Sequence, residues 1–172
     1  MIFILIGFFG ICVGSFLNVV ILRLSVGERV VSGRSHCMAC RKTLAWYDLV
    51  PIVSFFVLSG RCRSCQKNIS WQYPFVEVLT GILFVVPAIP LLKNGLSLGS
   101  AAQLLLQWYA IATLIVVFVY DSRYQLIPVS IITPAVIIIG LGSIILAPSS
   151  AVSLFVGCVV VAAFFSAQYF FS

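Results

Sequence analysis

Long apolar segments alternate with short polar ones along this chain of 172 residues. The one long polar stretch, residues 23–73, follows the first apolar segment. A helix rises about 1.5 Å per residue, so segments of this length match a hydrocarbon core about 30 Å thick. The pattern predicts an α-helical polytopic membrane protein with about five transmembrane helices, at residues 1–22, 75–92, 101–120, 131–147 and 151–171.

We expect three parts: a first transmembrane helix at 1–22, a loop at 23–73 and a helical membrane domain at 74–172. The composition agrees, because 62% of the residues are hydrophobic, only 8% are charged, and the mean hydropathy is +1.21. A secretory signal peptide is the main alternative for 1–22. No basic residue precedes that apolar run and no small-x-small cleavage site ends it, so we expect a retained helix. Pro87 and Pro90 suggest that the second helix kinks or ends early.

Positive charge is concentrated in the loop, which holds eight of the ten Lys and Arg residues. Loops rich in Lys and Arg stay on the cytoplasmic side of a membrane, so we expect this loop to be cytosolic. The lipid bilayer, with its anionic headgroups, is the expected neighbour of these charges, and nucleic acid is not. Counting the crossings then places the cysteine residues of the loop, Glu77, Asp121 and the C-terminus on one side of the membrane.

Four of the six cysteines form two Cys-x-x-Cys pairs, Cys37 with Cys40 and Cys62 with Cys65. Two such turns can supply the four thiolates of a tetrahedral zinc site. The 21 residues between Cys40 and Cys62 suit two knuckles with an insertion, so we expect a structural zinc site in a zinc-ribbon-like loop. The alternatives are unrelated redox or structural thiols, or His36 as a spare ligand.

The apolar insertion 49–58 is too short to span a bilayer, so we expect it to pack against the knuckles or lie at the lipid surface. In the first helix, Gly10 and Gly14 form a small-xxx-small step for close helix packing. Asp121 ends the third apolar run. It is either a helix-end residue paired with Arg123 or water, or a functional carboxylate, and one carboxylate alone does not make an aspartic peptidase.

Several motifs, in order, resemble those of the type IV prepilin peptidases. They are Gly14–Ile21 (GSFLNVVI), Arg34–Cys40 (RSHCMAC), Asp48–Pro51 (DLVP), Gly60–Cys65 (GRCRSC), Tyr73–Thr80 (YPFVEVLT) and Asp121–Pro128 (DSRYQLIP). The resemblance implies an aspartic peptidase of the bacterial inner membrane. Such enzymes cut the leader from prepilins and pseudopilins after a glycine, and many methylate the new amine with S-adenosylmethionine.

The resemblance also implies residue roles. Asp121 would be one member of the catalytic dyad, and the four paired cysteines would bind zinc. Gly14, Asn18, Arg34 and Glu77 match family positions and are weak candidates for substrate binding or methylation.

One family feature is missing, because the sequence has no Gly-x-Gly-Asp step to supply the second aspartate. A pair of Glu77 with Asp121, or Asp121 from two chains, is a remote substitute. Three hypotheses therefore stand: a prepilin peptidase and methyltransferase represented by an incomplete chain, a shortened relative that binds or methylates pilins, or a zinc-ribbon membrane protein that docks a cytosolic partner. Under the first two we expect no cleavage by this chain alone.

Overall fold

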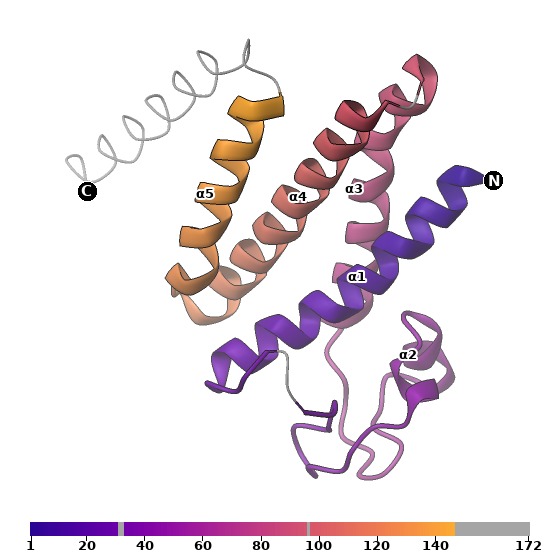
Figure 1. Ribbon diagram of the computed structural model, residues 1–172. Coiled ribbons are helices and arrows are strands. Elements are labelled where there is room, and N and C mark those ends of the chain that lie inside the picture. Colours follow the sequence, from indigo (N-terminus) through magenta and orange to yellow (C-terminus); the bar gives the residue numbers. More distant parts are fainter. Residues whose placement is uncertain (31–32, 96, 147–172) are drawn as a thin grey trace, which may run out of the picture.

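The computed structural model describes residues 1–30, 33–95 and 97–146 (Figure 1). It contains four long helices, α1 (Ile2–Ser25), α3 (Gln72–Asn94), α4 (Leu98–Tyr124) and α5 (Val129–Leu146), and two short ones between α1 and α3, η1 (Trp46–Leu49) and α2 (Val53–Val57). All four long helices are long and apolar enough to cross a membrane. The predicted polytopic helical membrane fold is thus confirmed, and the predicted fifth span lies outside the described residues.

The helix ends differ from the predicted ones at two informative places. Helix α3 does not end at Pro87 or Pro90 but continues past both to Asn94. Membrane helices tolerate proline because neighbouring groups satisfy the freed carbonyls and no water competes for the backbone. Helix α4 extends to Tyr124, so Asp121 lies in its last turn instead of just after it. The left-handed Gln125 ends this helix by donating its N–H to the Asp121 carbonyl, 2.8 Å away.

Helices α1 and α3 pack so closely that their backbones touch. A Cβ atom added to Gly10 would lie 2.9 Å from the Cα of Gly81 on α3, and one added to Gly14 would lie 2.8 Å from the Cα of Glu77. Real side chains do not fit at such distances. The structure therefore confirms that the Gly10–Gly14 step serves close helix packing.

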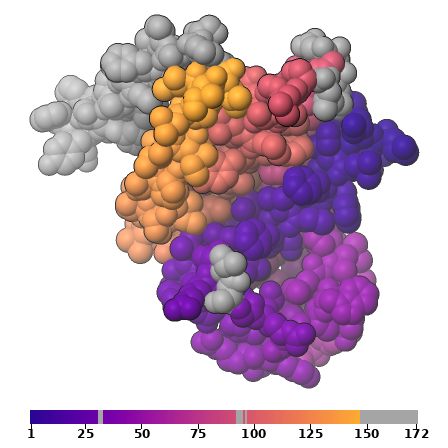
Figure 2. Space-filling model, in the orientation of Figure 1, coloured from indigo at the N-terminus to yellow at the C-terminus, as the bar shows by residue number. Residues whose placement is uncertain are grey.

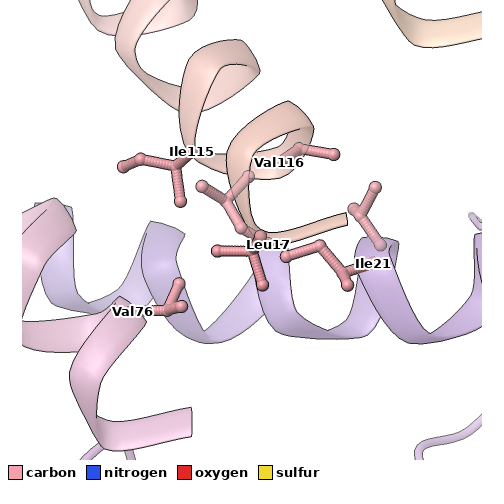
Figure 3. Packing of buried hydrophobic residues seen from close by; sticks show 7 residues of the cluster. Leu17, Ile21, Val76, Ile115 and Val116 are labelled. Atoms are coloured by element: carbon pink, nitrogen blue, oxygen red, sulfur yellow. The ribbon is translucent and has the colours of Figure 1, made fainter. Parts of the chain in front are cut away.

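The hydrophobic core lies where α1 crosses α3 and α4. Leu17 and Ile21 of α1 meet Val76 of α3 and Ile115 and Val116 of α4 (Figure 3). Helix α5 packs along α4 only at the edge of the bundle, and 6% of its membrane-length window is buried (Figure 1). Apolar side chains of α5 are exposed instead, as expected for a helix that faces lipid.

The loop between α1 and α3 forms a knob at one end of the bundle, the end at which α4 turns into α5 (Figures 1 and 2). Its apolar insertion folds back on the knob, as one of the two expectations had it. The Phe55 ring of α2 lies 4.8 Å from the Trp71 ring, and a Cβ added to Gly60 would be 3.2 Å from that phenylalanine. Val53, Phe56 and Val57 of α2 are exposed.

Candidate metal centre and its links to the membrane helices

The first Cys-x-x-Cys pair sits in a tight turn closed by its own backbone. The Cys37 amide donates to the carbonyl of Lys42 at 3.0 Å, and the Arg41 amide donates to the carbonyl of Cys37 at 2.9 Å. Arg41 has a φ of 58°, a left-handed conformation that reverses the chain after Cys40. The turn thereby presents both thiols to the same side.

The second pair repeats this geometry 25 positions later. The Cys62 amide donates to Lys67 at 2.9 Å, the Gln66 amide donates to Cys62 at 3.0 Å, and Gln66 has the same φ of 58°. The two turns are therefore equivalent knuckles, each ready to offer two thiols to one ion.

All four sulfur atoms gather at one point. Those of Cys37, Cys40, Cys62 and Cys65 lie within 4.8 Å of one another. The Cys37 and Cys65 sulfurs are 3.8 Å apart. Four thiolates bound tetrahedrally at about 2.3 Å from one zinc ion would be separated by about 3.8 Å. The cluster thus has the donors and the size for a metal ion held by four thiolates.

Backbone amides favour a thiolate at one of these positions. Hydrogen bonds from the N–H groups of Cys65 and Ser64 lower the pKa of the Cys62 thiol to about 6. The pKa of Cys65 moves the other way, to about 11: the Lys67 amide favours its thiolate, but burial and the neighbouring thiols outweigh it. Without a metal ion, one negative charge among clustered sulfurs disfavours the next, and a cation would remove that conflict.

His36, the alternative ligand that the sequence offered, lies outside the sulfur cluster. Its Nε2 is 3.4 Å from the Arg41 guanidinium and 4.0 Å from the Glu28 carboxylate, and Arg41 pairs with Glu28 at 3.4 Å. On the second knuckle, Arg63 pairs with Asp48 at 2.9 Å. Charged groups around the knuckles are therefore tied to one another, and the four thiols remain as the candidate ligands.

A buried arginine fixes the N-terminal end of the loop to α1. Arg23, in the last turn of α1, is 7% exposed. Its guanidinium donates to the carbonyls of Arg29 at 3.2 Å, Val30 at 2.9 Å and Gly33 at 2.9 Å. The sequence did not indicate this anchoring role for Arg23. The available clue was a single Arg directly after an apolar run, with glycines following.

A buried asparagine fixes the C-terminal end of the loop, where it enters α3, to α1. Asn18, at 1% exposure, donates from Nδ2 to the Tyr73 carbonyl at 3.2 Å and to the Gly14 carbonyl at 3.3 Å. Its Oδ1 accepts from Gln72 Nε2 at 3.3 Å. Gly14 and Asn18, which the family resemblance marks as weak substrate or methylation candidates, thus both lie inside the α1–α3 contact.

Glu77 holds the apolar insertion. Its side chain, at 6% exposure, accepts a hydrogen bond at 2.7 Å from the backbone N–H of Ile52, which precedes α2. Ile52 has a φ of 61°, an outlier for a β-branched residue, so this carboxylate stabilises a strained turn. Arg34 is apart from these groups, exposed on the first knuckle.

Asp121 is exposed in the last turn of α4. The expected pair with Arg123 is not formed, because Arg123 donates to Ser70 Oγ at 2.9 Å. This bond joins the Asp121 end of α4 to the segment that leads from the second knuckle into α3. The cysteine knob, Glu77 and Asp121 thus lie at one end of the helix bundle (Figure 1), which is consistent with their predicted position on one side of the membrane. The C-terminus, predicted to lie with them, is outside the described residues.

The other three acidic side chains are all engaged, Glu28 with Arg41, Asp48 with Arg63 and Glu77 with the Ile52 amide. Among the residues that the structure describes, Asp121 is the acidic side chain with no hydrogen bond or ion pair. An exposed, uncommitted carboxylate at a helix end is free to act on a ligand or substrate.

Comparison with known proteins gives the chain a family. Residues 8–91 match the family model described as Bacterial Peptidase A24 N-terminal domain. The prepilin leader peptidase/N-methyltransferase of Myxococcus xanthus (strain DK1622) is 52% identical over 75 residues, which are 44% of this chain and 22% of that protein. No solved structure matches the chain significantly.

Two further relatives match over more of the chain. The prepilin leader peptidase/N-methyltransferase of Bacillus subtilis (strain 168) is 35% identical over 120 residues, covering 70% of this chain and 46% of that protein. The type 4 prepilin-like proteins leader peptide-processing enzyme of Escherichia coli O78:H11 is 35% identical over 137 residues, covering 69% and 48%. The chain therefore spans about half the length, or less, of these relatives. It belongs to the prepilin leader peptidase family, through the N-terminal domain that residues 8–91 match.

Proposed function

We propose that this protein takes part in the processing of type IV prepilins or pseudopilins at the cytosolic face of the bacterial inner membrane. The relatives named above are prepilin-processing enzymes. The observation that carries the proposal is the hydrogen bond from Arg123 to Ser70, which brings the Asp121 end of α4 against the cysteine knob. Positive charge in the knob supports a cytosolic position, the side of the membrane on which a prepilin would present its basic leader.

In this proposal zinc is the metal of the four-cysteine cluster, and it organises the knob. Sulfur ligands at this spacing suit zinc, and four protein ligands leave no open position for a water molecule. Cys37, Cys40, Cys62 and Cys65 would hold the ion. Its chemical contribution is to neutralise the thiolates and tie the two knuckles together.

Asp121 is the proposed first carboxylate of the peptidase. An aspartic mechanism uses two carboxylates that share a proton, one as base toward the attacking water and one as acid toward the leaving amine. The exposed Asp121 suits one of these roles. Glu77 does not supply the other, because its carboxylate is buried and bonded to Ile52. Residues 1–172 thus provide one carboxylate of the two, and we expect binding of a prepilin without cleavage.

Methylation of the new amine would require S-adenosylmethionine. The knob has a hollow of about 470 Å³ beside α2, with Phe56 and Trp71 in its wall together with Arg61. Aromatic faces suit an adenine ring, but none of the residues lining this hollow is acidic. Ser59 and Asn68 could accept hydrogen bonds from ribose hydroxyls, but no carboxylate in this hollow pairs with the positive sulfonium and amino groups. We therefore assign no residue of the chain to the cofactor.

The proposal can be tested with the 172-residue chain in proteoliposomes and a purified prepilin. We expect the prepilin to crosslink to a photoreactive group placed at Arg34, on the surface of the knob, and its leader to stay uncut. The Asp121→Asn variant should crosslink equally well. Leader cleavage that Asp121→Asn abolishes would show that this chain assembles a complete dyad. Absence of any crosslink would overturn prepilin recognition and favour docking of a different cytosolic partner.

A further inference from the structure

The apolar insertion exposes more hydrophobic surface than a water-facing loop should. Val53 is 57%, Phe56 60% and Val57 71% exposed on α2. Trp46, 78% exposed, belongs to η1, which contacts α2, and Trp71, 69% exposed, has its ring 6.3 Å from that of Phe56. Contiguous exposed apolar surface of this kind marks a docking site or contact with a membrane.

Contacts to the long helices fix how deep this surface lies. Ile52, which precedes α2, donates to Glu77, and Ser15 of α1 lies near the same carboxylate. Ser15 precedes Arg23 by eight residues, which is about 12 Å along a helix axis. Helix α2 is therefore held beside the apolar part of α1. That part lies further toward the middle of the bilayer than Arg23, where α1 meets the loop. Figure 2 shows the knob lying along the flank of α1.

Charge beside this surface indicates what covers it. Residues 23–73 contain eight Lys and Arg against two acidic residues, Glu28 and Asp48, and both acids are paired with arginines. Arg61 lines the hollow of about 470 Å³ together with Phe56 and Trp71. A cation next to aromatic and aliphatic side chains matches the boundary between anionic headgroups and acyl chains.

We propose that α2, with Trp46 and Trp71, is a wedge that inserts into the leaflet facing the knob, and that Arg61 contacts the headgroup of an anionic phospholipid. We call these residues the lipid wedge. Glu77 holds the wedge at its depth through Ile52. The inference goes beyond the proposed function and does not depend on it, since it requires only that the long helices span a bilayer. A pilin helix is the competing occupant.

The test uses tryptophan quenching by brominated lipids. In a background with Trp46, Trp71 and Trp108 replaced by Phe, a single tryptophan is introduced by Phe56→Trp or, as the matched control on the first knuckle, by Met38→Trp. Burial 5–10 Å into the boundary predicts at least a roughly twofold loss of emission for Phe56→Trp in brominated vesicles. Met38→Trp should lose little. Equal, weak quenching of both would overturn the wedge.

Two further arms keep the result decisive. If the substituted background fails to fold, judged by its metal content, p-benzoylphenylalanine is placed at Val57 in the otherwise native chain, with Met38 as control. Lipid adducts at Val57 alone support the wedge. Adducts to an added prepilin in place of lipid would assign the surface to a pilin helix.

The headgroup contact is tested separately with mixed vesicles. Bromine is carried either by phosphatidylglycerol or by phosphatidylcholine, at equal amounts of each lipid. We expect Phe56→Trp to be quenched about twofold more by the anionic lipid, an excess that Arg61→Gln should remove because a single phosphate contact is lost. Equal quenching by the two lipids before that substitution would overturn the role of Arg61.

Discussion

Replacing Gly14 by alanine should separate α1 from α3, and the structure gives the size of the effect. The new Cβ would lie 2.8 Å from Glu77 Cα, 2.9 Å from Thr80 Oγ1 and 3.0 Å from the Val76 carbonyl. Ordinary van der Waals contact starts at 3.4 Å, so the helices must move apart by about 0.6 Å. Overpacking of a tight interface costs roughly 1–3 kcal/mol.

Gly7→Ala in the same helix is the matched control. Its Cβ would meet only Val85 Cγ2, at an ordinary 3.6 Å. Both substitutions gain about 0.5–1 kcal/mol because alanine favours a helix over glycine. This gain cancels when the two variants are compared. The difference in the free energy of unfolding between them therefore isolates the steric effect, and Gly14→Ala should be less stable by roughly 1–3 kcal/mol.

The assay is a titration of both variants from mild detergent into sodium dodecyl sulfate, followed by tryptophan emission. Trp108 stacks on Phe84 of α3 at 5.1 Å and lies 5.6 Å from Phe9 of α1, so it reports the separation of these helices. A Gly14→Ala variant that unfolds at the same detergent fraction as Gly7→Ala would refute the close contact of α1 with α3.

Three further predictions concern the metal and the two anchored ends of the knob. Cys62→Ser combined with Cys65→Ser should reduce zinc from about one ion per chain to near none by metal analysis, whereas Cys12→Ser should keep it. Zinc retained in the double variant would show that the four-cysteine cluster is not the zinc site. Asn18→Ala should destabilise the chain by about 1–3 kcal/mol in the same detergent titration, because buried polar partners on α3 are left unpaired; an unchanged midpoint would contradict this. Arg23→Lys should speed amide hydrogen exchange over residues 33–37 by roughly tenfold, since an ammonium cannot match the guanidinium fork. Unchanged exchange would show that the three carbonyl contacts do not hold the loop.

The four described spans and the gathering of the four cysteines could be predicted because each depends mainly on local sequence. A long apolar run forms a helix in a membrane whatever its neighbours are, since no water satisfies its backbone. Likewise, a Cys-x-x-Cys turn presents two thiols by its own backbone geometry, and the pairing of two turns was the simplest use of four thiols. The tight contact at Gly14 was also legible from the spacing of small residues.

Contacts between segments that are distant in the chain could not be predicted from the sequence. Nothing near Arg123 in the chain indicates that its partner is Ser70, 53 residues earlier. The bond from Ile52 to Glu77 was equally hidden, because it uses a backbone amide made available by an unusual left-handed turn. The expected early end of α3 at Pro87 or Pro90 was wrong, because it applied a rule for soluble helices to a membrane helix.

The anchoring of both ends of the knob by buried side chains has a consequence for its position relative to the membrane helices. Arg23 and Asn18 anchor both ends of the loop to α1, so the knob moves with the membrane helices instead of swinging on linkers. A knob held in this way keeps a constant position along the bilayer normal relative to the spanning helices. The position of Asp121 relative to the sulfur cluster along the bilayer normal is then fixed by the fold.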